Sequence, residues 1–281
     1  MMFANRVISG LAASLLLGVT ASAVVAGPYP SFSDTSHQVL PGQISAWATS
    51  VVDYSPTAGV DAAYADASHA LAANDGGIVS LGDLDAAQIA AGDLPGTLTV
   101  KFDTLISDLA GPDLAVFENA SQFYTDPVIF AELAYVEVSS NGTDFVRFPS
   151  VSLNTEDDLV ANFGRAYAGA DTTNIYNLAG VHPTGIGTPF DLAELSGMAE
   201  VVSGAVDLSA IQYVRLVDIP GSGDFVDSLG NPIFDAWVTT GSGGLDLDAV
   251  GAINTVPEPS TTLLALLGIA LVAGGRLAKR G

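Results

Sequence analysis

The sequence predicts a mainly β protein, an antiparallel β-sandwich with an apolar helical segment at each end of the chain. Three observations lead to this class. Short runs rich in Val, Ile, Leu, Phe and Tyr alternate with polar residues, which is the pattern of half-buried strands. Turn-forming residues separate these runs. The chain has no cysteine, so the core must hold by burial of apolar surface, helped at most by a bound ion.

The first 26 residues have the pattern of a secretory signal peptide. Arg6 supplies a positive start, residues 7–20 are apolar, and Ala21-Ser22-Ala23 offers a cleavage site between small residues. We therefore expect residues 1–26 to be removed on export. Residues 27–45 are rich in Pro and Ser and predict an extended lead-in to the body.

Residues 46–254 form the predicted β-sandwich body. Strands are expected from alternating or β-rich runs at residues 44–54, 78–81, 97–102, 130–138, 145–148, 211–219 and 245–253. Short helical or looped segments are expected at residues 60–73, 83–94 and 191–198, within otherwise long loops at 150–200.

Two local features of the body are specific enough to test. Asn141-Gly142 tolerates the positive φ angles of a type I′ turn, so it predicts a β-hairpin between residues 130–138 and 145–148. In the strand at 211–219, strict alternation would put Ile211 on the face opposite Val214.

The charge of the body is strongly negative. Of the 31 acidic residues, 30 lie between the signal peptide and the tail. The basic residues among them are Lys101, Arg147, Arg165 and Arg215. Such a body would repel nucleic acid and anionic membrane surfaces, and it would attract cations.

The tail has three parts in order. Pro257, Glu258 and Pro259 interrupt any helix, residues 261–275 are apolar, and a basic end follows at Arg276, Lys279 and Arg280. The apolar run predicts a transmembrane helix, with the basic end on the cytoplasmic side and the body outside. As a helix, the sixteen uncharged residues at 260–275 would span about 24 Å, which is less than the roughly 30 Å of a hydrocarbon core. Such a short span suits a transient anchor.

Residues 255–281 resemble the PEP-CTERM sorting signal of Gram-negative bacteria in all three parts. The resemblance implies export by the general secretion machinery and transient anchoring in the inner membrane. It also implies processing by a membrane-embedded exosortase and a final location at the cell surface or outside the cell.

The body resembles secreted bacterial surface proteins whose folds are similar to galactose-binding-type jelly-roll sandwiches. Four stretches carry this likeness: VVDYSP at residues 51–56, GPDLAVFEN at 111–119, AELAYVEVS at 131–139 and GGLDLDAV at 243–250. Residues 83–94 depart from it, because a glycine-rich link is expected there.

No catalytic motif is present: the sequence has no H-E-x-x-H, no G-x-S-x-G and no cysteine nucleophile. A metal site is the sharper hypothesis, because Ca²⁺ takes carboxylate and carbonyl oxygens from flexible loops. The candidate ligands are Asp113, Glu118, Asp227, Asn231, Asp235, Asp246 and Asp248. We expect one structural Ca²⁺ where the first and last strands meet; the alternative is a solvated acidic surface.

A sugar-binding site is a further hypothesis by analogy of fold, with Trp237 as a candidate stacking platform and a half-buried anchor as its alternative. We therefore predict a non-catalytic surface or extracellular-matrix protein. Two alternatives remain. The first is a carbohydrate-binding module acting in extracellular polysaccharide. The second is an extracellular hydrolase, which would need two carboxyl groups that converge in one pocket.

Overall fold

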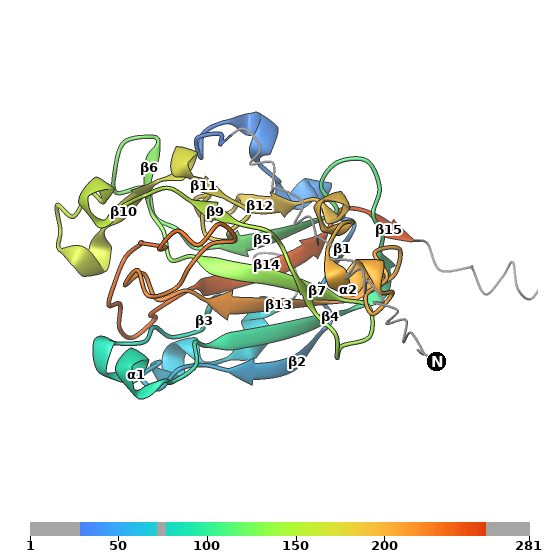
Figure 1. Ribbon diagram of the computed structural model, residues 1–281, viewed down its shortest axis with the longest axis horizontal. Helices are drawn as coiled ribbons and strands as arrows, with labels where there is room; N and C mark the ends of the chain where they lie inside the picture. Colours follow the sequence, from blue (N-terminus) through green and yellow to red (C-terminus); the bar gives the residue numbers. More distant parts are fainter. Residues whose placement is uncertain (1–28, 72–76, 257–281) are drawn as a thin grey trace, which may run out of the picture.

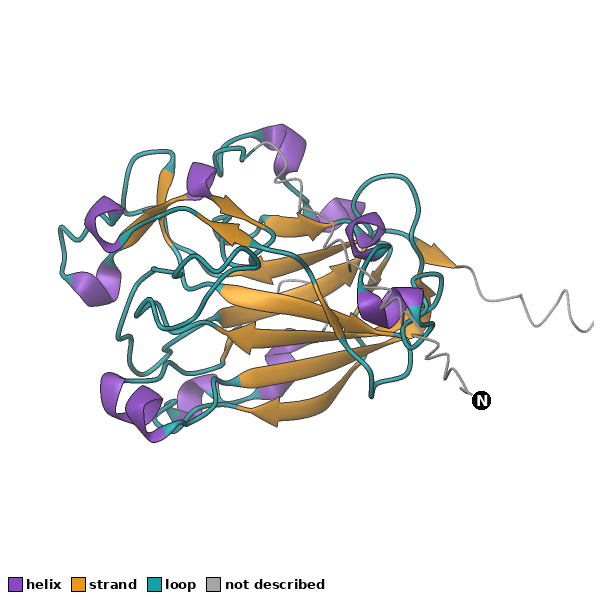
Figure 2. Ribbon diagram, viewed as in Figure 1, coloured by secondary structure: helices purple, strands orange, loops and turns teal. Residues whose placement is uncertain are grey.

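The computed structural model describes residues 29–71 and 77–256. Across these residues the chain forms two antiparallel sheets that pack on a common core, with short helices and long loops around them (Figures 1 and 2). This confirms the mainly β, antiparallel prediction. The predicted signal peptide (1–26), the Pro257-Glu258-Pro259 motif, the transmembrane helix and the basic end lie outside the described residues. Within the described ranges, no helix combines the length and apolar character that a membrane crossing requires.

The first sheet has five strands within the described residues. Its order is β1 (Ala46–Trp47), β14 (Asp246–Ala252), β5 (Leu114–Glu118) and β12 (Gly187–Phe190), and β3 (Val79–Ser80) also pairs with β14. Every residue of β5, β12 and β14 is buried. Loops and short elements therefore cover the outer face of this sheet, while the second sheet packs against its inner face.

The second sheet has six strands in the same part of the chain. Its order is β15 (Thr255–Val256), β4 (Thr97–Ile106), β13 (Ile211–Asp218), β7 (Ala134–Ser139) and β8 (Val146–Arg147), and β2 (Ser50–Ser55) also pairs with β4. The long strands β4 and β13 confirm the strands predicted at 97–102 and 211–219.

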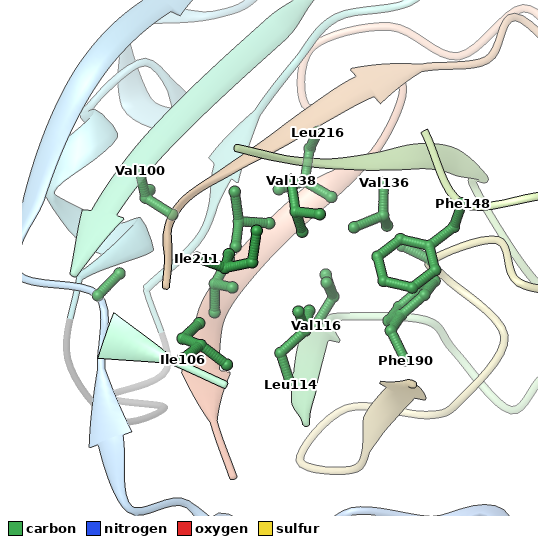
Figure 3. Close-up of a cluster of buried hydrophobic side chains, with 14 of the residues drawn as sticks. Val100, Ile106, Leu114, Val116, Val136, Val138, Phe148, Phe190, Ile211 and Leu216 are labelled. Carbon is green, nitrogen blue, oxygen red and sulfur yellow. The ribbon is translucent and has the colours of Figure 1, made fainter. Parts of the chain in front are cut away.

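The main core lies between the two sheets. Val116 of the first sheet packs in one cluster with Val136, Val138 and Leu216 of the second, and Phe148 closes one side of it (Figure 3). Full burial of one such side chain stabilises the fold by roughly 1.5–3 kcal/mol. In β4 and β7 the alternating apolar residues therefore face this core, as the pattern of apolar and polar residues predicts.

Two short ribbons extend the sandwich where long loops were predicted at 150–200. β6 (Val128–Phe130) pairs with β10 (Gly169–Asp171), and β9 (Val151–Ser152) pairs with β11 (Ile175–Tyr176). A second apolar cluster, which includes Ile129 and Leu178, lies beneath them. The prediction of loops therefore missed four short strands, β9 to β12.

The helices are short and peripheral (Figure 2). Asp85 caps α1 (Ala86–Ala91) by accepting hydrogen bonds from the amides of Ala87 and Gln88, in agreement with the helical segment expected at 83–94. The other helices are α2 (Ala199–Val202) and the 3₁₀ helices η1 (Thr35–His37), η2 (Pro41–Gln43), η3 (Ala62–Tyr64), η4 (Ala67–Ala70), η5 (Glu156–Asp158), η6 (Arg165–Tyr167), η7 (Thr172–Asn174) and η8 (Leu192–Leu195).

The predicted hairpin is confirmed, but its turn differs. β7 and β8 pair Glu137 with Arg147, and Gly142 has a positive φ of 76°. Asn141 has no positive φ, as a type I′ turn would require. Instead its side-chain Oδ1 accepts hydrogen bonds from the amides of Thr143 and Asp144, at 2.8 and 2.9 Å.

Two strand predictions need correction. Ile211 lies in the same core as Val214, not on the opposite face, because a β-bulge between Ile211 and Tyr213 shifts the alternation by one residue. The strand predicted at 245–253 is β14, yet it is not the last: β15 follows and pairs with β4 of the other sheet.

Candidate metal site at one end of the sandwich

Six carboxyl groups are buried at one end of the sandwich, and we call them the carboxylate cluster. In each of them one oxygen is buried without a hydrogen-bond partner. Their residues are between 0% and 8% exposed. The six are Asp83, Glu118, Glu132, Asp218, Asp235 and Asp246.

Strand pairing explains why these residues lie at the same end of the sandwich. Asp218 ends β13 opposite Ala134, which begins β7 two residues after Glu132. In the other sheet Glu118 ends β5 opposite the second residue of β14, and Asp246 begins β14. The cluster therefore joins both sheets at the end drawn at the left in Figure 1.

Main-chain amides fix one oxygen of several members. The amide of Ala120 donates to Glu118 Oε2 at 2.6 Å. The amide of Leu133 donates to Asp235 Oδ2 at 2.8 Å. The amide of Leu245 donates to Asp218 Oδ1 at 2.8 Å. These bonds orient the carboxyl planes and leave the second oxygen of each group without a donor.

Two glycines make room for the cluster. A Cβ at Gly221 would lie 1.8 Å from Asp235 Oδ1, and a Cβ at Gly244 would lie 2.5 Å from Asp218 Oδ1. Gly244 also has a positive φ of 67°, which favours glycine. Any larger residue at Gly221 would displace the Asp235 carboxyl group.

The environment of the cluster raises the pKa of its members. Burial is the largest cause for Glu118 and Glu132, and repulsion from Asp246 is the second. Burial raises the pKa of Asp83 to about 6 and that of Asp246 to about 7. Without a positive charge among them, these carboxyl groups therefore keep their protons at a pH at which ordinary carboxyl groups have lost them.

One cationic side chain acts on the cluster. The Arg165 guanidinium donates hydrogen bonds to the backbone oxygens of Asp235 and Gly221. Its positive charge offsets part of the rise that burial causes in the pKa of Asp83 and Asp235. The remaining Lys and Arg residues of the described ranges lie in the second, six-stranded sheet. There Arg147 and Arg215 pair with Glu137, and the Lys101 ammonium lies over the Tyr213 ring. Arg165 is therefore the one basic side chain of the described ranges that faces these six carboxyl groups.

A pocket of about 270 Å³ opens beside the cluster, and Glu132 and Asp246 both line it. Its other polar residues are Asn119, Ser121, Thr239, Thr240 and Ser242, and its aromatic residues are Phe123, Phe130 and Tyr167. Two carboxyl groups therefore do converge in one pocket. This is the condition that the hydrolase alternative sets.

Three of the predicted ligands, Glu118, Asp235 and Asp246, belong to the cluster. Two others, Asp227 and Asn231, organise a loop: Asp227 Oδ1 accepts from the Asn231 amide and Oδ2 from Asn231 Nδ2, both at 2.8 Å.

Asp248 is buried in β14, where a bulge separates Leu247 from Ala249.

Asp113 lies at the opposite end of the sandwich, where β1 and β14 meet. One oxygen each of Asp108, Asp113 and Asp191 lies within 4.8 Å of the other two. Both Asp113 oxygens already have donors, because Asn254 Nδ2 donates to Oδ1 and the amide of Leu192 donates to Oδ2. Among the described residues, this is the one group of three acids whose oxygens lie so close together, whereas the carboxyl groups with one unpartnered oxygen lie at the other end.

Trp237 does not offer the exposed platform that sugar stacking requires. It is half-buried, and its indole Nε1 donates to the backbone oxygen of Leu84 at 2.8 Å. The geometry is that of a loop anchor. The exposed aromatic rings are Phe123, Phe163 and Tyr167 instead.

Sequence reasoning missed Asp83, Glu132 and Asp218 as candidates. A signal was available for two of them. Glu132 interrupts an apolar run of β character, and Asp218 ends a strong strand, so both are acids in segments that pack into a core. Asp83 follows Gly82 in a loop, and no local pattern indicates its burial.

Comparison with known proteins concerns the tail alone. Residues 255–280 match the PEP-CTERM protein-sorting motif. No curated protein matches the chain. The motif implies an exported protein that is anchored in a membrane before exosortase processes it. The described residues show that the part of the chain before the motif is a β-rich body.

Proposed function

We propose that the chain is an exosortase-processed protein of the cell surface or extracellular matrix, with a non-catalytic β-sandwich that binds Ca²⁺ at the carboxylate cluster. The observation that carries this proposal is the set of six buried carboxyl groups, each with an oxygen that lacks a partner. Leaving an ionised carboxyl group buried and unpaired is costly, so these groups either keep their protons or share a cation.

The donor set favours a hard cation. Ca²⁺ takes six to eight oxygen ligands, whereas zinc sites use His and Cys. The cluster consists of carboxyl groups only, and hydroxyl and amide groups surround Asp246. A Ca²⁺ ion there would hold β5 and β14 of one sheet against β7 and β13 of the other.

The two packed antiparallel sheets also support a galactose-binding-type jelly roll for the body, as the four resembling stretches imply. Three of these stretches coincide with core strands: β5, β7 and β14. On this reading the Ca²⁺ is structural, and the loops at that end carry any ligand-binding role.

Thermal unfolding tests the Ca²⁺ proposal. Extracellular Ca²⁺ modules bind with Kd of roughly 10⁻⁴–10⁻³ M, so about 5 mM Ca²⁺ fills such a site. We expect the midpoint to rise by about 5 °C relative to the same protein in chelator. Glu118→Gln and Asp246→Asn should reduce this rise.

Two controls sharpen the test. The exposed Asp157→Asn removes a charge outside the cluster, and Asp113→Asn alters the acids at the other end of the sandwich. Both should keep the rise with Ca²⁺. An identical midpoint in Ca²⁺ and in chelator would remove the proposal.

The shared pocket of Glu132 and Asp246 favours a second candidate, an extracellular hydrolase with a carboxyl pair. General acid–base catalysis needs groups within hydrogen-bond reach of the substrate. Glu132 is only 4% exposed and Asp246 only 2%, which argues for cation binding instead. Hydrolysis of a polysaccharide that disappears in Glu132→Gln would establish the hydrolase.

A further inference from the structure

Three exposed aromatic rings, which we call the aromatic rim, adjoin the pocket that Glu132 and Asp246 line. Phe123, Phe163 and Tyr167 are 57%, 66% and 55% exposed, and together they line an adjoining groove of about 300 Å³. Phe123 and Tyr167 belong to both the groove and the pocket. Exposed aromatic rings therefore lead directly to the buried carboxyl groups.

The rim has a defined structure because its rings support one another. The rings of Phe123 and Phe130 are 5.8 Å apart, and those of Phe130 and Tyr167 are 6.2 Å apart, between centroids. The Tyr124 hydroxyl donates to the backbone oxygen of Tyr167 at 2.6 Å. This bond joins the loop that precedes β6 to helix η6.

The two parts of this site attract the same kind of ligand. Aromatic faces attract cations, particularly organic ammonium ions, and an apolar stem packs against the same rings. At the inner end, Glu132 is fully buried and has an unpartnered oxygen. An ammonium nitrogen brings both hydrogen-bond donors and a positive charge to this oxygen, and no neutral or anionic ligand brings both.

We propose that this pocket binds a small organic ammonium ion, with its charged nitrogen toward Glu132 and Asp246 and its stem between Phe123 and Tyr167. The polar residues Ser121, Thr239 and Ser242 complete the wall around the charged end. The site shares Glu132 and Asp246 with the proposed Ca²⁺ site, so the two cations would compete for these carboxyl groups, but the ammonium site also requires the aromatic rim.

Calorimetric titration with n-butylammonium tests the inference, and 1-butanol serves as the neutral probe of similar shape. The titration uses the folded protein in chelator at neutral pH, so that its outcome is independent of Ca²⁺. We expect saturable binding of the ammonium ion, weakened by added salt, and no saturable binding of the alcohol.

Variants of the rim separate cation binding from apolar contact. Phe123→Leu and Tyr167→Leu keep apolar bulk but remove the aromatic face, and each should weaken binding roughly 3- to 30-fold. The exposed Leu229→Ala, outside the pocket, should leave binding unchanged. Because the rim residues are exposed, these variants keep the core intact.

Variants of the floor test the charge. Glu132→Gln should abolish binding, and Asp246→Asn serves in its place if the first variant does not fold. Three results would overturn the inference: no saturable binding of n-butylammonium, equal binding of 1-butanol, or unchanged binding in both rim variants.

Discussion

Burial of a single carboxyl group makes the stability of the folded protein depend on pH. The pKa of Asp246 is raised to about 7 and that of Asp83 to about 6, from an ordinary value of 3.8. The folded protein therefore holds protons that the unfolded chain releases. Stability contributed by these groups is present below about pH 4 and is lost as the pH rises toward 7.

We expect the chelated protein to have a larger free energy of unfolding at pH 5 than at pH 7.5, as measured by urea denaturation. His182 acts in the opposite direction, because burial lowers its pKa to about 4. Comparison with Asp246→Asn cancels that contribution: the variant should lose less stability over this interval than the parent chain. An equal loss in both proteins would show that Asp246 is not protonated in the fold.

Single residues also show where prediction from sequence ends. Glu118, Asp235 and Asp246 were candidates because they are acids near turns. Their burial, and that of Glu132, depends on which strands pair, since the ends of β5, β13 and β14 meet only in the folded sheets. The sequence shows directly which residues are acidic, whereas strand pairing decides which of these side chains lie at the same end of the sandwich.

At the scale of elements, the hairpin of β7 and β8 shows a local signal that works through a different contact. The Asn141 side chain holds the turn by accepting two backbone hydrogen bonds. Asn141→Ala should therefore lower the free energy of unfolding by about 1 kcal/mol. Replacing the neighbouring exposed residue, Thr143→Ala, should change the free energy of unfolding little. If urea denaturation gave the same loss of stability for both variants, this role of Asn141 would be contradicted.

Strand length decides which elements the sequence could predict. β4 and β13 are long enough to show alternation, and they were predicted. β12 (Gly187–Phe190) was missed because it is short and contains Gly and Pro. Pro189 fits there because β12 lies at the edge of its sheet, where one row of amides needs no partner.

At the scale of the whole molecule, the sorting tail and the body make separate predictions. Replacing Pro257, Glu258 and Pro259 by alanines should prevent processing, so that the protein stays in the membrane fraction with its full C-terminus. Mass spectrometry of the C-terminal peptide measures this directly. Normal processing of the triple variant would contradict the role of the motif.

The order of the two sheets was less accessible from sequence than their β character. The cluster links β5 and β14 of one sheet to β7 and β13 of the other, although β13 and β14 lie far from β5 and β7 along the chain. Long-range pairing of this kind leaves no local trace. The sequence could therefore indicate an acidic β-sandwich. The location of a cation site stays a prediction, because three acids lie close together where β1 and β14 meet, whereas the buried carboxyl groups with an unpartnered oxygen lie at the other end.

The central claim is that Ca²⁺ joins the two sheets through the carboxylate cluster. Calorimetric titration of the chelator-treated protein with Ca²⁺ at about pH 7.5 tests it most directly. The account predicts saturable uptake that weakens at pH 5, as the carboxyl groups take up protons, and that Asp246→Asn reduces. Absence of uptake at pH 7.5, or full uptake by Asp246→Asn, would contradict it.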